Sequence, residues 1–214
     1  AYAGTSPNAL PTTWRFRLFG KLFRFVSRVL SRPSSERLPD LGDDPVVFVA
    51  NHTSMSDVFY AIATLSDWKY PARCLVRYSY FKNPLMGTFL RTVDCVAAGG
   101  GGTDAVAVAV EILETGLPVA VMVEGRIVPP DERADDGMGE FRDGFVTIAR
   151  NADARVLPIV ITNADRVWGS RATLPHFDSA TGRQSGNTLS VDELVDSEAI
   201  AEARSQMAAM LARP

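Results

Sequence analysis

One of the only two histidines in this chain of 214 residues lies two positions after an apolar run, and an acidic residue stands five positions later. His52 comes after the sequence VVFVA, and Asp57 follows the small polar stretch TSMS. An imidazole acts as a general base when a carboxylate fixes its tautomer and stabilises its charged form. Positions five apart in a continuous helix point about 140° from one another, so the pair meets only if the chain turns between them. Ser and Thr favour such a turn.

Residue types alone leave other interpretations of this pair open. His52 could be a surface residue beside the start of a helix, or one ligand of a metal ion. A metal ion would need a further ligand, and the second histidine, His176, falls in a stretch that we interpret as a loop. A serine hydrolase using Ser54 or Ser56 is disfavoured because the chain has no G-x-S-x-G sequence. Because the sequence offers no suitable further ligand, we expect no metal site.

The elements that must position the pair alternate along the chain, which predicts one α/β domain. Apolar runs of strand length occur at 46–50, 72–77, 94–98, 117–123 and 155–162. Helical patterns occur at 56–65, 81–93, 103–116, 142–153 and 190–212. Thr103 or Asp104 is expected to cap the third of these helices, and Gly116 to end it. His52 then lies just past the carboxyl end of a strand, where α/β sheets usually carry their sites. The acidic loop 129–144 is expected to stay solvated near the site.

Composition excludes several classes of protein. The net charge of −3 gives no nucleic-acid signature. Cys74 and Cys95 are too few for a disulfide scaffold and are expected to pack as small hydrophobic residues. No apolar run approaches the roughly 20 residues that span a bilayer, so we expect a peripheral protein without a transmembrane helix.

The positive charge is concentrated near the N-terminus. Residues 13–32 carry six basic residues and no acid, and Trp and Phe occur among them at helical spacing. Such a helix suits the interface of an anionic membrane. The alternative is a helix that packs on the domain with its charges solvated. We expect residues 1–35 to form a basic amphipathic membrane-interface segment and residues 36–214 to form the catalytic domain.

Four sequence blocks give the pair a context. NHTSMSD (51–57) resembles the N-H-x-x-x-x-D motif of the glycerolipid acyltransferases, the family that contains lysophosphatidate and glycerol-3-phosphate acyltransferases. FKNPLMGTFLR (81–91) resembles the second block of that family, and VMVEGRIVPP (121–130) its third. FRDGFVTIARNADARVLPIVI (141–161) resembles the helix and strand that follow. The resemblance runs from about residue 45 to 165.

The resemblance implies a role for each matched residue. His52 would be the base and Asp57 its orienting partner. The candidates for substrate binding in the matched blocks are Asn51, Glu124, Gly125, Arg126 and Arg142. Arg77 and Arg91 are further candidates for the phosphate, because the arginine that usually ends the second block is missing. Asn51 is either a loop-fixing or a ligand-facing amide, Glu124 would accept from an acceptor hydroxyl, and Arg126 would grip a phosphate. Two departures from the family pattern leave the acceptor's identity open. CVAAGGGG lacks the arginine that often ends the second block, and Val123 stands where the third block has proline.

The implied fold is a single α/β domain with a mixed sheet flanked by helices and an N-terminal amphipathic helix. The implied reaction moves a fatty acyl group from acyl-CoA or acyl carrier protein to 1-acylglycerol-3-phosphate, forming phosphatidic acid, without a cofactor. The expected partners are the acyl donor, a lysophospholipid and the anionic membrane surface at its cytoplasmic face, and no nucleic acid. Glycerol-3-phosphate or another lysophospholipid as acceptor, thioesterase activity, and a non-catalytic lipid-binding role remain alternatives.

Overall fold

The computed structural model describes residues 13–30, 34–35, 41, 44–68, 70, 72–99, 104–169, 182–185 and 195–213. The predicted loop histidine His176 and most of the glycine turn before residue 104 lie outside these residues. The strands are β1 (Ser34–Ser35), β2 (Val46–Ala50), β3 (Arg73–Arg77), β4 (Val96–Ala98), β5 (Val119–Met122), β6 (Arg155–Thr162) and β7 (Gly182–Ser185). The helices are α1 (Thr13–Leu30), α2 (Asp57–Asp67), α3 (Tyr78–Phe81), α4 (Pro84–Thr92), α5 (Ala105–Glu114), α6 (Gly144–Asn151), α7 (Ala164–Trp168) and α8 (Asp196–Leu211), with one 3₁₀ turn, η1 (Pro130–Glu132).

The strands of the described residues form one mixed sheet in the order β1-β7-β6-β2-β5-β3-β4. Strands β2 to β6 are mutually parallel, and β7 runs antiparallel to β6. The central strand β2 is buried along its whole length, as its continuous apolar run predicts. The mixed α/β sheet that the sequence predicts is confirmed. Because β2 ends at Ala50, it delivers the following residues to the carboxyl edge of the sheet.

The sheet parts between β3 and β5. These strands pair only through Arg73 with Val119 and Cys74 with Ala120, after which β3 pairs with β4 and β5 with β2. Further along, the Arg77 side chain crosses the gap and donates to the carbonyl oxygen of Gly125 at 2.9 Å. A side chain thus replaces the backbone ladder at the edge where the strands end.

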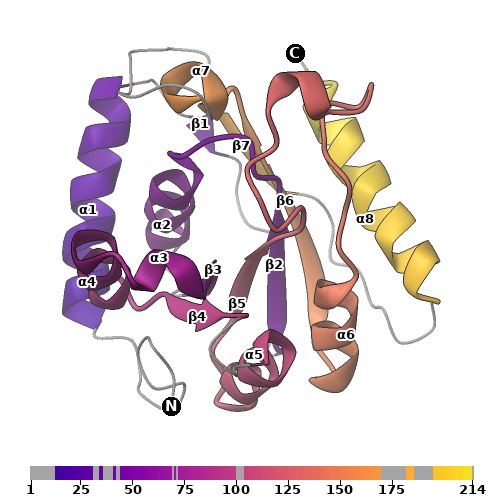
Figure 1. The fold of residues 1–214 in the computed structure, drawn as a ribbon, viewed down its shortest axis with the longest axis horizontal. Coiled ribbons are helices and arrows are strands. Elements are labelled where there is room, and N and C mark those ends of the chain that lie inside the picture. Colours follow the sequence, from indigo (N-terminus) through magenta and orange to yellow (C-terminus); the bar gives the residue numbers. More distant parts are fainter. Residues whose placement is uncertain are drawn as a thin grey trace.

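Helices cover both faces of the sheet (Figure 1). Helices α1, α2 and α4 lie on one face, where their core includes Phe48, Ile62, Leu90 and Ile159. Helices α5, α6 and α8 lie on the other, over a core that includes Val49, Ile112, Val146 and Met207. Alternate residues of each strand therefore enter different cores, which is why the strands read as unbroken apolar runs.

Helix α1 has two apolar faces rather than one. Its inner face packs on the domain, with the Phe23 ring 5.1 Å from that of Phe59 and 5.6 Å from that of Phe89. At Gly20 a Cβ would lie 2.1 Å from Ser66 Oγ, so only glycine permits this close approach to α2. Its outer apolar residues are exposed to solvent: Leu18, Leu22, Phe25, Val26 and Val29. Across the described residues, no helix is long and apolar enough to cross a bilayer.

Element bounds agree with the patterns in the sequence where the apolar runs are long. Asp104 caps α5 by accepting from the backbone N–H of Val106, as one of the two predicted caps. Short elements without a hydrophobic period, namely α7, β7 and β1, carry no signal in the sequence. The loop 129–144 is not uniformly solvated as predicted, because Met138 is fully buried within it.

Candidate active site

His52 and Asp57 meet across a tight turn between β2 and α2. The Nδ1 of His52 lies 3.0 Å from Oδ2 of Asp57. The same oxygen accepts the backbone N–H groups of Thr53 at 2.7 Å and Ser54 at 2.8 Å. The turn that their spacing requires is therefore present, and the carboxylate itself holds it. With Nδ1 donating to Asp57, the tautomer leaves Nε2 of His52 with a lone pair, and the ring lines a cavity.

Asp57 is fully buried, and this burial raises the pKa of its carboxyl above the usual value. The bonds from His52, Ser54 and Thr53 act in the opposite direction, since each favours the carboxylate. Their combined effect is smaller than that of desolvation. A buried carboxylate directed at one ring nitrogen stabilises a positive charge on the imidazole more strongly than a solvated one would. The arrangement therefore suits a histidine that takes up a proton during a reaction.

Glu124 holds the backbone of the same histidine from the other side. Its Oε2 accepts the backbone N–H of His52 in a short contact, and its Oε1 accepts the N–H of Gly139 at 3.0 Å. Glu124 is buried, and desolvation raises the pKa of its carboxyl. Both oxygens are thus occupied within the protein. This differs from the expectation that Glu124 faces an acceptor hydroxyl, and it makes Glu124 a support of His52.

The support of His52 extends to the C-terminal helix. Arg204 of α8 donates to the carbonyl oxygen of Gly139 at 2.8 Å and forms a two-pronged ion pair with Asp136 at 2.7 and 2.8 Å. Its guanidinium also lies 5.1 Å from the centre of the Phe141 ring. Arg204, Gly139, Glu124 and His52 therefore form one continuous series of contacts. Sequence reasoning missed Gly139 and Arg204, because neither belongs to a motif.

Asn51 fixes the loop rather than facing the cavity. Its side-chain oxygen accepts the backbone N–H of Ile161 at 2.8 Å, and its side-chain nitrogen donates to the carbonyl oxygen of Ile161 at 3.0 Å. It is 1% exposed. Of the two roles open for Asn51 from the sequence, the geometry favours the loop-fixing one.

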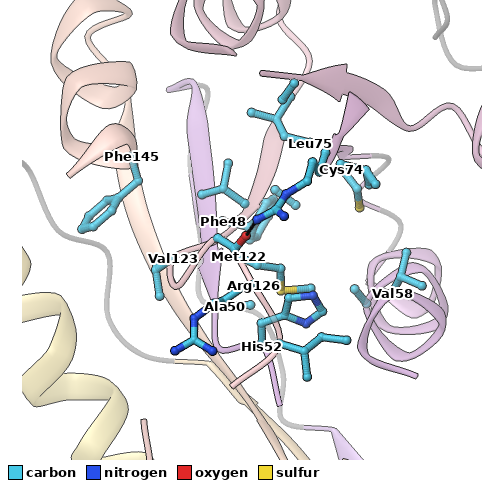
Figure 2. Close-up of a pocket in the computed structure, with 18 of the residues that line it drawn as sticks. Phe48, Ala50, His52, Val58, Cys74, Leu75, Met122, Val123, Arg126 and Phe145 are labelled. Carbon is cyan, nitrogen blue, oxygen red and sulfur yellow. Dashed lines mark hydrogen bonds between the residues drawn. The ribbon is translucent and has the colours of Figure 1, made fainter. Parts of the chain in front are cut away.

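A large apolar cavity of about 940 Å³ adjoins His52 (Figure 2). Its lining comes from both faces of the sheet, since Phe48 and Met122 belong to one core and Val121 and Phe145 to the other. Residues of β3 and β5 beyond their last pair, among them Leu75 and Val121, are part of this lining. Figure 2 shows His52 and Val58 on one side of this region and Phe145 on the other. A space of this size and polarity fits an aliphatic chain.

Three exposed arginines gather at the polar end of the cavity, around Gly125. Arg77 donates to the Gly125 carbonyl, and Arg126 and Arg142 also line the cavity. Gly125 has a positive φ of 66°, which glycine adopts without strain, and this conformation brings the backbone close to Arg142. Arg126 forms a 2.6 Å ion pair with Glu132 in which both side chains are about half exposed. Three guanidinium groups around an open loop suit a phosphate.

Arg91 lies elsewhere. It stacks 5.6 Å from the centre of the Phe81 ring, contacts the Phe81 carbonyl oxygen at 3.5 Å, and does not line the cavity. The structure thus separates Arg91 from the other candidate phosphate ligands. The described residues also contain no group of three or more His, Cys, Asp or Glu side chains placed to hold a metal ion.

Comparison with known proteins gives concordant matches. Residues 30–162 match the model of the family described as Acyltransferase. The chain is 29% identical over 126 residues to a probable 1-acyl-sn-glycerol-3-phosphate acyltransferase of Mycoplasma genitalium, covering 56% of this chain and 45% of that protein. It is 26% identical over 148 residues to the chloroplastic 1-acyl-sn-glycerol-3-phosphate acyltransferase LPAT1 of Arabidopsis thaliana, covering 66% of this chain and 38% of that protein. The matched region is less than half the length of either relative.

The fold has a solved counterpart. The crystal structure of the 1-acyl-sn-glycerophosphate acyltransferase PlsC from Thermotoga maritima superposes with a TM-score of 0.72. The match covers 94% of this chain and 80% of that one, at 18% sequence identity. At this identity the likeness concerns the fold.

Proposed function

Because the chain belongs to the acyltransferase family, whose model matches more than half of it, we propose that it transfers a fatty acyl group from a thioester to the free hydroxyl of 1-acylglycerol-3-phosphate. The donor would be acyl-CoA or an acyl carrier protein loaded with the acyl group. One observation carries the proposal: His52, paired with the buried Asp57, lines an apolar cavity that three arginines also line. Base, chain-binding space and phosphate ligands are thus adjacent.

The proposed reaction begins with His52. Its Nε2 takes the proton of the acceptor hydroxyl as the oxygen attacks the thioester carbonyl carbon. A C–O bond forms and the C–S bond breaks. The proton then passes from the imidazolium to the departing thiolate, which leaves as a free thiol. No covalent acyl-enzyme is required if both substrates are bound together, since proximity lowers the barrier.

Asp57 and Glu124 divide the task of positioning His52. Asp57 fixes the ring tautomer and stabilises the imidazolium, and Glu124 fixes the backbone from which the ring projects. Because both carboxylates are buried and bonded to backbone N–H groups, neither needs to reorganise as the proton moves.

The arginines around Gly125 would bind the phosphate of the acceptor. Arg126 is the principal candidate, because an exposed ion pair such as that with Glu132 is worth little and is easily exchanged for a phosphate. Arg77 and Arg142 would supply the flanking charges. The size of the apolar cavity favours a chain-bearing acceptor over free glycerol-3-phosphate.

Helix α1 would hold the protein on an anionic membrane surface. Its exposed apolar residues Leu18, Leu22, Phe25 and Val29 recur at intervals of four and three, and so form one stripe along the helix. The exposed residues Lys21 and Arg28 lie beside that stripe. A helix that presents an apolar stripe with basic side chains next to it binds at the level of the lipid headgroups.

A thiol-release assay with acyl-CoA tests the activity. Free CoA should appear rapidly when a lysophosphatidate with a short, water-soluble chain is present, and slowly without it. The acylated product should form in equal amount. Release that ignores the acceptor would indicate a thioesterase, and no release with either acyl-CoA or acyl carrier protein would indicate a non-catalytic lipid-binding protein.

A further inference from the structure

Exposed apolar side chains are concentrated in two neighbouring places. Among the described residues, the exposed large hydrophobic side chains are Leu18, Leu22, Phe25, Val26, Val29, Tyr80, Leu85 and Val195. Five are on α1, and Val195 precedes α8 on the opposite face of the sheet. The other two, Tyr80 and Leu85, lie at the junction of α3 and α4, residues 78–86, which we call the α3–α4 corner. Leu85 is 84% exposed, more than any of the others.

The α3–α4 corner adjoins α1. Phe89 of α4 packs on Phe23 of α1, with ring centres 5.6 Å apart. Leu85 precedes Phe89 by four residues, so both lie on the same side of α4. Asn83 caps the helix by accepting the N–H groups of Leu85 and Met86, each at 3.0 Å, which fixes the position of Leu85. Figure 1 shows α3 and α4 beside the lower part of α1.

The charge of the corner matches that of α1. Lys82 of the corner is exposed and lies 5.4 Å from the centre of the Tyr78 ring. The exposed residues Arg77 and Arg91 flank the corner, and Arg91 contacts the Phe81 carbonyl oxygen. The only acid between residues 69 and 103 is Asp94, which is 5% exposed. The corner therefore combines a protruding leucine and a partly exposed tyrosine with basic side chains. Anionic lipid headgroups above an acyl layer would complement this surface.

We propose that the α3–α4 corner is a second contact with the anionic bilayer and that it places the cavity opening against the lipid. Tyr80 and Met86 of the corner line the same cavity as His52. Lipid contact at Leu85 would therefore put the corner end of the cavity at the membrane surface. This inference rests on the proposed function, which supplies a reason for a membrane-embedded acceptor to enter there.

A lipid surface fits the corner better than a protein partner does. The core of a protein interface is depleted of lysine, because a desolvated ammonium group needs a specific partner. Phosphate headgroups accept lysine and arginine without such a partner and leave them hydrated. A leucine among basic side chains, on a helix that packs on α1, is thus placed as membrane-interface residues are.

The test places an environment-sensitive fluorophore on one introduced cysteine at a time in the full chain. The variants are Leu85→Cys, Leu22→Cys on α1 and, as the matched control, Val195→Cys. Native Cys74 and Cys95 are buried, and the unmutated chain measures any labelling of them. The probe is a vesicle of equal parts phosphatidylcholine and phosphatidylglycerol, which offers anionic charge without supplying the acceptor. We expect the emission at positions 85 and 22 to shift to the blue, and that at 195 to stay unchanged.

An activity measurement accompanies the fluorescence. Leu85→Asp should lower transfer to lysophosphatidate in vesicles by about tenfold, because a charge would replace the exposed leucine that is proposed to enter the lipid. Transfer to the short-chain acceptor should stay unchanged, since Leu85 does not line the cavity.

Each other outcome is decisive. A blue shift at 22 with none at 85 would overturn the second contact and leave the docking of α1 intact. A shift at 85 that grows with protein concentration without vesicles would mean that a second copy covers the corner, which also overturns it. If the unmutated chain fails to acylate the short-chain acceptor, the proposed function is wrong, whatever the labels report.

Discussion

The two faces of the sheet share apolar cores but differ in the further contacts that hold their helices. On the α1–α2–α4 face, the rings of Phe23, Phe59 and Phe89 pack against one another. The apolar cavity is lined from this face and from the other. On the α5–α6–α8 face, Arg204 and Arg150 tie α8 to the rest of the domain through ion pairs with acidic partners. Apolar packing adapts to a chain that enters, whereas directional bonds keep a group in place. His52 is held from both faces, its ring by Asp57 of α2 and its backbone by Glu124.

The largest effect is expected where the two faces meet. His52→Ala should lower transfer by about 10²- to 10⁴-fold, because it removes the general base. Asp57→Asn should cause a smaller loss, because the ring remains but its orientation and charge stabilisation weaken. Thiol release under saturating donor, with folding checked by circular dichroism, measures both. Near-normal turnover in His52→Ala would exclude the mechanism.

The next largest effect concerns the outer surface of α1. Reversing Lys21 and Arg28 to Glu should weaken binding to anionic vesicles by about 10²-fold at low salt, since each basic residue near such a surface contributes about 1 kcal/mol. The difference should shrink at high salt, where these charges are screened. Co-sedimentation at two salt concentrations measures it. Arg24 is left unchanged because its 2.8 Å ion pair with Asp67 fastens α1 to α2. Binding that ignores both reversals would place the membrane contact elsewhere.

A third prediction tests whether the contacts that α8 makes through Arg204 help to position His52. Arg204→Ala should lower kcat about tenfold with little change in KM for the acceptor, because Gly139 and then Glu124 lose their support. In a Glu124→Gln background the same substitution should have an effect of only about twofold, since the connection is already broken.

Arg150→Ala is the matched control for this third prediction. It removes another ion pair that anchors α8, that with Asp196, without touching the contacts to Gly139. Equal losses in Arg150→Ala and Arg204→Ala would mean that Arg204 acts only by docking α8. Additive losses in the double variant with Glu124→Gln would lead to the same conclusion.

A smaller effect is expected at the phosphate end of the cavity. Arg126→Ala should raise KM for lysophosphatidate about fivefold to tenfold and leave donor hydrolysis nearly unchanged, because a charge-assisted contact is lost on the acceptor side. Glu132→Gln should lower the same KM by a few fold, about what an exposed ion pair is worth, since Arg126 is released from that pair. A rise in KM for acyl-CoA instead would assign Arg126 to the donor.

The smallest effect is on stability and depends on pH. Burial raises the pKa of Asp57, so the folded state binds this proton more tightly than the unfolded state does. The resulting stabilisation is present at acid pH and is lost as the pH rises through the raised pKa. Asp57→Asn does not titrate, so its Tm relative to the unmutated chain should increase as the pH rises above the ordinary aspartate pKa of about 4, by about 2–4 °C per kcal/mol. A difference independent of pH would contradict the assigned shift.

Sequence reasoning recovers the elements whose signal is local. The strands β2 and β6 are predicted with the bounds that the structure has, because both are long apolar runs covered on two sides. The turn between His52 and Asp57 is predictable because side chains five residues apart need one to meet. The position of Asp104 as a cap follows from its residue type at the end of a glycine turn.

The remaining features depend on contacts between distant parts of the chain. Glu124 belongs to a recognisable motif, yet the partners of its two oxygens, His52 and Gly139, are set by how separate loops fold together. Arg204 is one of several polar residues on an amphipathic helix, and nothing in its spacing marks it. The apolar period of α1 is visible in the sequence, but only the packing of Phe23 shows that a different face is buried.

The parting of β3 and β5 has a consequence for motion. Residues of β2 are paired on both sides, whereas among the residues that the structure describes the edge of β3 facing β5 has no ladder beyond Cys74, and the Arg77 side chain reaches across to Gly125. Amide hydrogens along this edge should exchange with solvent faster than those of β2. A chain that fills the cavity would exclude water from the same edge and slow that exchange. The exchange rate of a few backbone amides in β3 would thus show whether a ligand fills the cavity, even when no reaction takes place.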